Sequence, residues 1–121
     1  MKCAMMKLKS VYESFAPDDG ERVLIERLWP LEIDVYYHKI DRWLKDIAPS
    51  YELIESLREN KNDWDGFKKS YIKELADQQM QAILRDLKDR SLESTVSMLY
   101  ASSASERSFA MVVYEYLSHM T

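Results

Sequence analysis

An uninterrupted apolar run, Val23-Leu24-Ile25, constrains the fold of this 121-residue chain more than any other feature. A strand with one solvent-exposed face alternates apolar and polar side chains, whereas a continuous run is typical of a strand covered on both faces. The run opens the segment VLIERLWPLE, residues 23–32, in which Pro30 stops a strand because proline has no N–H to donate. The sequence therefore predicts a buried strand that ends near Arg27 and Trp29.

Two more strands are predicted elsewhere in the chain. Residues 5–12 alternate apolar and lysine side chains, which suits a short strand with one exposed face. Residues 94–101, STVSMLYA, are rich in strand-forming residues and mostly apolar. Residues 16–20, APDDG, predict a turn, because proline fixes φ and glycine tolerates a positive φ.

Five helical segments are predicted from apolar residues that recur every three or four positions. The strongest signal is the series Trp64, Phe67, Tyr71 and Leu75. Asp34 and Ser50 are suited to cap the first two segments. The predicted helices cover residues 34–47, 51–57, 64–75, 80–87 and 110–117.

The order of these elements predicts an α/β fold, since strands and helices are interleaved along the chain. We expect residues 1–121 to form a single small domain of three-layer type, with a short, mainly parallel central sheet of about three strands and about five flanking helices. The strand at 94–101 returns after a long helical excursion, so its connection is expected to be a right-handed parallel crossover.

Composition narrows the classes of function. The net charge of −4 disfavours nucleic acid as a partner, because phosphate neutralisation needs a basic surface. Cys3 is the only cysteine and lacks a partner for a disulfide, a metal or a catalytic pair. No apolar run approaches the ~20 residues that span a bilayer, and the N-terminus does not resemble a signal peptide. We expect a cytoplasmic protein with no membrane association, either a monomer or a weak homodimer.

Two strand ends carry side chains suited to bind an anion, and ligands of open α/β sheets gather outside the carboxyl ends of the strands. One end holds Arg27 and Trp29. The other is LYASSASERS, residues 99–108, where a strand passes into a helix whose first N–H groups attract anions. Lys45 is a candidate second cation. The candidate ligand-binding residues are Arg27, Trp29, Lys45, Tyr100, Ser102, Ser103, Ser105 and Ser108.

A purely structural role is the alternative for these residues. Ser105 could simply cap the following helix, and Lys45 could form a surface ion pair. Arg27 could pair with a nearby carboxylate, of which the candidates are Glu32, Asp41 and Asp46.

The sequence contains no pattern for catalysis or for a cofactor. Gly20 and Gly66 are the only glycines, so there is no glycine-rich phosphate loop. His38 and His119 are the only histidines and lack metal-ligand spacing. No Gly-x-Ser-x-Gly nucleophile motif occurs. We therefore assign no catalytic residue, metal or cofactor.

Five pieces of the chain occur in a characteristic order: LKSVYE, DDGERVLIERLWP, DRWLKDIAPSYEL, WDGFKKSYIKEL and SMLYA. Together they resemble the DUF488 family, and within it the short YeaO-like branch. The resemblance spans about residues 7–117. It implies an α/β sandwich-like domain of uncharacterised function.

The chain departs from the family pattern at polar positions. The pattern D-R-L-W-P-R-G corresponds to residues 26–32, where Arg27 is kept but Leu31 and Glu32 replace an arginine and a glycine. G-H-D corresponds to residues 58–60, Arg-Glu-Asn, without the histidine. L-Y-A-A-K-D and H-N-x-A correspond to residues 99–104 and 107–110, without the aspartate and the asparagine. The missing groups are those that could move protons, which implies either binding without catalysis or the use of a different ligand.

Three hypotheses for function follow. The first is binding of an anionic or phosphate-bearing small molecule at the strand-end crevice. The second is a protein–protein interaction or structural module, whose partner surface would include the aromatic cluster Tyr36, Tyr37 and His38. The third is an enzyme, which is the weakest because no acid–base pair can be assigned.

Overall fold

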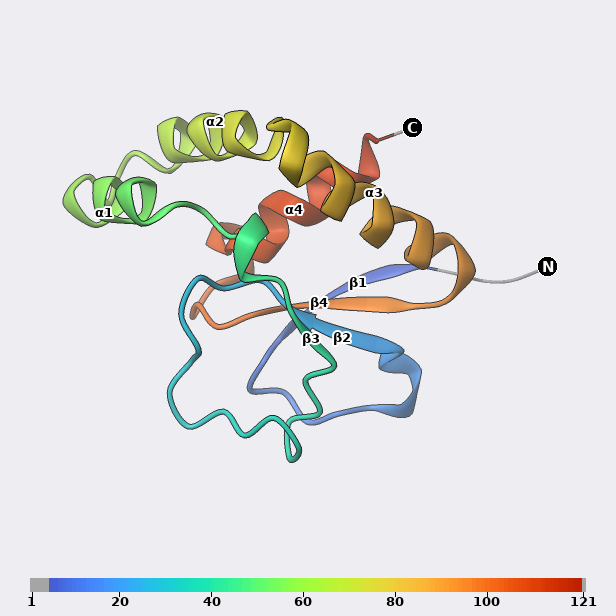
Figure 1. The fold of residues 1–121 in the computed structure, drawn as a ribbon. Helices are drawn as coiled ribbons and strands as arrows, with labels where there is room; N and C mark the ends of the chain where they lie inside the picture. The colour runs from blue at the N-terminus through green and yellow to red at the C-terminus, as the bar shows by residue number, and fades with distance from the viewer. Residues whose placement is uncertain (1–4, 121) are drawn as a thin grey trace.

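The computed structural model describes residues 5–120, and the described chain forms a sheet of four parallel strands (Figure 1). The strands are β1 (Met6–Ser10), β2 (Glu21–Leu24), β3 (Arg42–Trp43) and β4 (Val96–Tyr100). They lie in the order β1-β4-β2-β3, and all three pairings are parallel. The prediction of an α/β fold with a mainly parallel sheet is confirmed, with four strands in place of about three.

Within residues 5–120, four α-helices lie on one face of the sheet (Figure 1). They are α1 (Tyr51–Glu59), α2 (Trp64–Leu75), α3 (Gln78–Glu93) and α4 (Phe109–Ser118). Three short 3-10 helices, η1 (Pro17–Asp19), η2 (Lys45–Ile47) and η3 (Ser105–Arg107), lie in the connections. The opposite face is covered by the β1–β2 connection and by the long loop between β2 and β3 (Figure 1). The third layer is therefore made of loops.

Two hydrophobic cores lie on the two faces of the sheet. The helix-side core packs Val23 and Met98 against buried side chains of α2, α3 and α4. The loop-side core consists of Val11, Leu24, Ile33, Ile40 and Leu99. Val23 and Leu24 point to opposite faces, as the period of two in a strand requires. The apolar run is buried on both sides, as the sequence predicts.

An ion pair is buried at the start of β2. Arg22 is fully buried, and its Nη1 lies 2.7 Å from Oδ2 of Asp19, which is also buried. Lys9 Nζ lies 2.9 Å from the same carboxylate, and the Ala16 N–H donates to it. The Ser97 hydroxyl of β4 donates to the Asp19 carbonyl. These bonds attach the η1 turn to three strands through one polar cluster.

The predicted strand over the VLIERLWP segment is shorter than expected. β2 ends at Leu24, and one further ladder bond joins the Ile25 N–H to the Leu99 carbonyl. Arg27 and Trp29 follow in a loop. The strand ends three residues before Arg27 and well before Pro30, so the proline is not what terminates it.

The predicted helix over 34–47 is wrong. The segment forms turns, the short strand β3 and η2. Lys39 has φ of 52°, which interrupts a right-handed helix. The periodic residues do not share a face: Ile40 packs in the loop-side core, Ile47 in the helix-side core, and Tyr36 is 90% exposed. Asp34 does accept from the Tyr36 and Tyr37 N–H groups, but these bonds close only a single turn.

The other predicted strands and helices are present in the structure, and only their first and last residues differ from the prediction. Ser50 caps α1 by accepting from the Leu53 N–H at 3.2 Å. α4 is capped by Ser108, which accepts from the Met111 N–H, and not by Ser105. Cys3 lies outside the described residues.

Neither a membrane-crossing segment nor a metal-binding cluster is found between residues 5 and 120. No helix there combines the length and the apolar character needed to cross a bilayer. No group of three or more His, Cys, Asp or Glu side chains there is arranged to hold a metal ion.

Candidate functional site

All four strands present their carboxyl ends at one edge of the sheet, at the left in Figure 1. The loop that contains Arg27 leaves this edge from β2, and residues 101–108 leave it from β4. Because parallel strands collect their following loops at one edge, this region is the candidate site that the fold itself selects.

Arg27 is held in place by backbone carbonyls. Its Nε donates to the Pro49 carbonyl at 3.0 Å, and its Nη2 donates to the Ala48 carbonyl at 2.8 Å. Its guanidinium lies 5.6 Å from the centre of the Tyr51 ring. Among residues 5–120 it has no ion pair with a carboxylate, so pairing with Glu32, Asp41 or Asp46 is not observed.

The cavity beside Arg27, here called the acidic cavity, has a volume of about 330 Å³, and carboxylates outnumber cations among its lining residues. Three carboxylates line it, those of Asp46, Glu74 and Asp77. Glu74 is engaged, since it accepts from the Ser50 N–H and hydroxyl. None of the serines of residues 102–108 lines this cavity. Arg27 and the serine segment therefore do not share a pocket, and the charge around Arg27 does not favour an anion.

Trp29, Lys45 and Tyr100 lie in separate surroundings. Trp29 belongs to the loop-side core, where its Nε1 donates to the Ile33 carbonyl at 2.8 Å. The Trp29 and Trp43 rings pack edge-on, with 5.3 Å between their centres. Lys45 Nζ lies 5.3 Å from the centre of the Trp43 ring. Tyr100 packs against the helix-side core. Trp29 and Lys45 are thus linked through Trp43 on the loop side, away from Tyr100.

The serine segment uses its hydroxyls for local structure. Ser102 donates to the Ala104 carbonyl, and Ser108 donates to the Ser105 carbonyl while it caps α4. Ser105 contacts the Glu106 carboxylate at 3.5 Å. Ser103 is exposed.

A second cavity at this edge, here called the basic cavity, is lined only by cationic and apolar side chains. It has a volume of about 360 Å³, and its lining residues are Ile54, Leu57, Arg58, Lys61, Trp64 and Arg107. Arg107 ends η3, within the serine segment. Arg58 has an exposed ion pair with Glu55, whereas the side chains of Lys61 and Arg107 make no hydrogen bond or ion pair with any residue from 5 to 120. The Trp64 ring stacks on the Phe67 ring, with 5.0 Å between the ring centres.

The three cations of the basic cavity are functional candidates that the sequence prediction missed. Arg58 and Lys61 belong to a stretch that reads as an ordinary polar loop. Arg107 lies within the predicted serine segment, and this was the one sequence signal that pointed to the basic cavity. Convergence of the three residues depends on how α1 packs beside α2 and η3, and no pattern in the sequence encodes it.

Glu26 is another residue that the sequence prediction did not single out. Its Oε2 accepts from the Ala101 N–H at 3.0 Å, which joins the ends of β2 and β4. Burial raises the pKa of Glu26 to about 7, and the hydrogen bond from Ala101 only partly opposes this shift. In the sequence, the signal that could have identified Glu26 is its position directly after the apolar run Val23-Leu24-Ile25. Its carboxyl group changes charge near neutral pH.

Tyr71 lies close enough to Glu26 for the two groups to interact electrostatically, and its hydroxyl is already hydrogen-bonded. Its hydroxyl donates to the Ile47 carbonyl, and burial raises its pKa well above the usual value, with the nearby Glu26 and Glu74 carboxylates adding to the shift. Neither residue lies beside a nucleophile or a histidine that would complete an acid–base pair.

Comparison with known proteins gives one consistent result. A family model described as "Inactive DUF488-N3 subclade" matches residues 5–121. The uncharacterized protein Rv3073c of Mycobacterium tuberculosis is 37% identical over 113 residues, which cover 93% of each chain. The uncharacterized protein YeaO of Escherichia coli is 30% identical over 112 residues, which cover 93% of this chain and 96% of YeaO. No solved structure matches the chain significantly.

Proposed function

Because the chain belongs to the DUF488 family, within the DUF488-N3 subclade described as inactive, we propose that it binds a small phosphate-bearing anion in the basic cavity without catalysing a reaction. The observation that carries this proposal is the charge of one cavity. Arg58, Lys61 and Arg107 line it without any carboxylate, in a chain whose net charge is −4. Such a concentration of positive charge lowers the energy of a bound anion.

The chemistry of the lining groups favours phosphate. A guanidinium can bind two oxygens of a phosphate with parallel hydrogen bonds, and an ammonium adds a compact charge. Arg107 and Lys61 have no competing partner among residues 5–120, so no existing bond with those residues must be broken when a ligand enters. The volume of about 360 Å³ lies within the usual range for small-molecule sites.

The resemblance noted in the sequence supports binding without turnover at this place. Arg107 stands where the pattern H-N-x-A has its histidine, and Glu59 stands where G-H-D has its histidine. Arg107 lines the basic cavity, and Glu59 directly follows Arg58, which also lines it. An arginine is always protonated near neutral pH, so it can hold an anion but cannot exchange protons with it.

The experiment is a thermal-shift screen of the full chain against inorganic phosphate, sulfate, nucleotides and phosphorylated metabolites. A ligand at one hundred times its Kd should stabilise the protein by ~2.7 kcal/mol, which raises Tm by several degrees. The shift should disappear in Arg107→Gln and persist in Lys73→Gln, an exposed cation of α2 outside the cavity.

Arg27→Gln separates the two strand-end cavities. We expect this variant to keep the ligand-induced shift. If the shift instead depends on Arg27 and not on Arg107, the ligand lies in the acidic cavity and the proposal is wrong about the site. If no compound shifts Tm, the proposal of anion binding fails.

A second candidate function is docking of a protein partner on the loop side. Leu31, Tyr36 and Tyr37 are 85%, 90% and 81% exposed, and such apolar exposure on neighbouring loop residues is typical of contact surfaces. His38 is half-buried, and its Nδ1 accepts from the Asp34 N–H. A second copy of the chain is the partner that can be tested directly. Sedimentation equilibrium should detect a weak dimer that Tyr36→Ser abolishes; a strictly monomeric parent protein would remove the dimer from consideration.

A further inference from the structure

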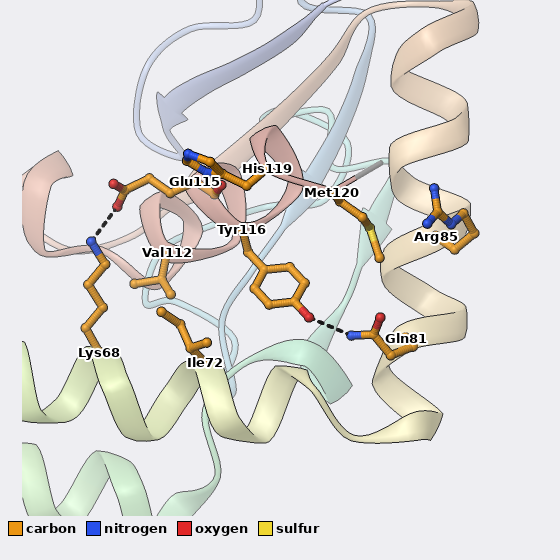
Figure 2. Close-up of a pocket in the computed structure, with 9 residues that line it drawn as sticks. All are labelled: Lys68, Ile72, Gln81, Arg85, Val112, Glu115, Tyr116, His119 and Met120. Carbon is orange, nitrogen blue, oxygen red and sulfur yellow. Dashed lines mark hydrogen bonds and ion pairs between the residues drawn. The ribbon is translucent and has the colours of Figure 1, made fainter.

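A third cavity lies between α2, α3 and α4, on the outer side of the helix layer (Figure 2). Its volume is about 570 Å³. One part of its wall is apolar, formed by Ile72 of α2, Val112 of α4 and Met120. Ile72 is 38% exposed and Met120 is half-buried, whereas Val112 is 1% exposed, so the apolar surface open to solvent belongs to Ile72 and Met120. None of the residues that line this cavity belongs to the strand-end loops, and the inference drawn from it does not depend on the anion site proposed above.

The polar part of the wall contains one cation without a partner. The side chain of Arg85 in α3 makes no hydrogen bond or ion pair with the described residues 5–120, although most arginine side chains of the chain are paired. The other charges that line the cavity cancel, because Lys68 Nζ lies 3.0 Å from Glu115 Oε1 (Figure 2). The lining therefore carries one uncompensated positive charge, at Arg85.

A hydroxyl with a free hydrogen lines the same cavity. Gln81 Nε2 donates to the Tyr116 hydroxyl at 2.8 Å, so that hydroxyl is an acceptor in this bond and keeps its own hydrogen to donate (Figure 2). Gln81 and Arg85 are four residues apart on α3 and therefore share a face of the helix. Figure 2 shows the Arg85 guanidinium apart from the Tyr116 hydroxyl, so these are two separate polar groups of the lining.

We propose that this cavity binds a small carboxylic acid with an apolar body. The carboxylate is held by Arg85, and the apolar body lies on Ile72 and Met120. A single guanidinium matches the single charge and the two oxygens of a carboxylate. The apolar wall gains stability when it is removed from water, which a bare inorganic anion cannot provide.

The experiment measures the binding of octanoate and phenylacetate to the full chain by isothermal titration calorimetry. Octanol and octylammonium are the control probes, since they carry the same apolar body with no charge or the opposite charge. We expect Kd for octanoate to rise about tenfold or more in Arg85→Gln, because hydrogen bonds to a charged group are lost. Ile72→Ser should weaken octanoate as well.

The matched control is Arg107→Gln, which removes an equally unpartnered arginine from the basic cavity and leaves the same net charge. Octanoate binding should be unchanged in this variant. The inference is overturned if neither acid binds, if octylammonium binds as well as octanoate, or if Arg85→Gln binds octanoate like the parent. A loss of octanoate binding in Arg107→Gln, with binding kept in Arg85→Gln, would also overturn it, because the acid would then lie in the basic cavity.

Discussion

Replacement of Asp19 by asparagine should destabilise the fold strongly, because it leaves the buried Arg22 guanidinium without its counter-charge. Asp19 is 1% exposed and Arg22 is 0% exposed, so water cannot substitute for the missing carboxylate. Removal of one partner from a buried ion pair costs about 3–5 kcal/mol. A chain of this length has a total stability of about 6–18 kcal/mol. The variant should therefore lose a large part of its free energy of unfolding.

Urea denaturation followed by circular dichroism measures this loss. With a slope of about 2 kcal/mol per molar, the midpoint should fall by about 2 M. Asp18→Asn is the matched control, since Asp18 is the preceding residue of η1 and pairs with Lys7 while its side chain is 79% exposed. We expect no measurable change in that variant. If both variants unfold at the same urea concentration, the buried pair does not stabilise the fold and the reasoning is refuted.

The same pair predicts a dependence on pH. Burial alone would raise the pKa of Asp19, but the hydrogen bonds from Lys9, the Ala16 N–H and Arg22 outweigh it, so the pKa lies below its ordinary value of 3.8. The carboxylate stabilises the fold above pH 3.8 and loses this effect as the pH falls through the lowered pKa. The difference in stability between the parent and Asp19→Asn should therefore shrink in acid.

Three further substitutions have expected outcomes. Gly20→Ala should lower Tm markedly, because Gly20 has φ of 66° and an added Cβ would lie 2.0 Å from the Thr95 carbonyl oxygen. Glu32→Gly should raise Tm by a few degrees, because Glu32 has φ of 63°; relief of about 1–2 kcal/mol of left-handed strain exceeds the added entropy of the unfolded chain, about 0.5–1 kcal/mol. Leu31→Gly is its control and should not stabilise. Tm of the parent should fall as the pH rises from about 4.5 to about 7, because Glu26 still holds its proton in the folded protein while the unfolded chain has released it. Tm of Glu26→Gln should not show this decline.

The structure explains why some elements could be predicted and others could not. The run Val23-Leu24-Ile25 identified a strand covered on both faces because every residue in it had to be buried, whichever way it pointed. α1 and α2 were predictable because each has a capping residue and one apolar face toward one core. The prediction of a helix over residues 34–47 was wrong because Ile40 and Ile47 have helical spacing in the sequence but pack in different cores.

The site was predictable only as a region. Parallel strands required their carboxyl ends to meet, so an edge of the sheet could be named from the sequence. Arg27 was then expected to face the serine segment, but its hydrogen bonds turn it toward Ala48 and Pro49. Arg107 lines the cavity that the cations share, together with side chains from a different helix and loop. Such convergence depends on the packing of helices, which local patterns do not contain.

The place of β4 at the centre of the sheet has a consequence for synthesis of the chain. Met6 and Val96 pair although they are 90 positions apart, and Glu21 also pairs with Val96. β1 and β2 are not neighbours in the sheet, so until residues 96–100 have left the ribosome β1 has no partner strand and β2 has only the two-residue strand β3. At about 5–20 residues per second, the first strands wait for several seconds with unpaired edges. The sheet is therefore expected to assemble only after β4 has been synthesised.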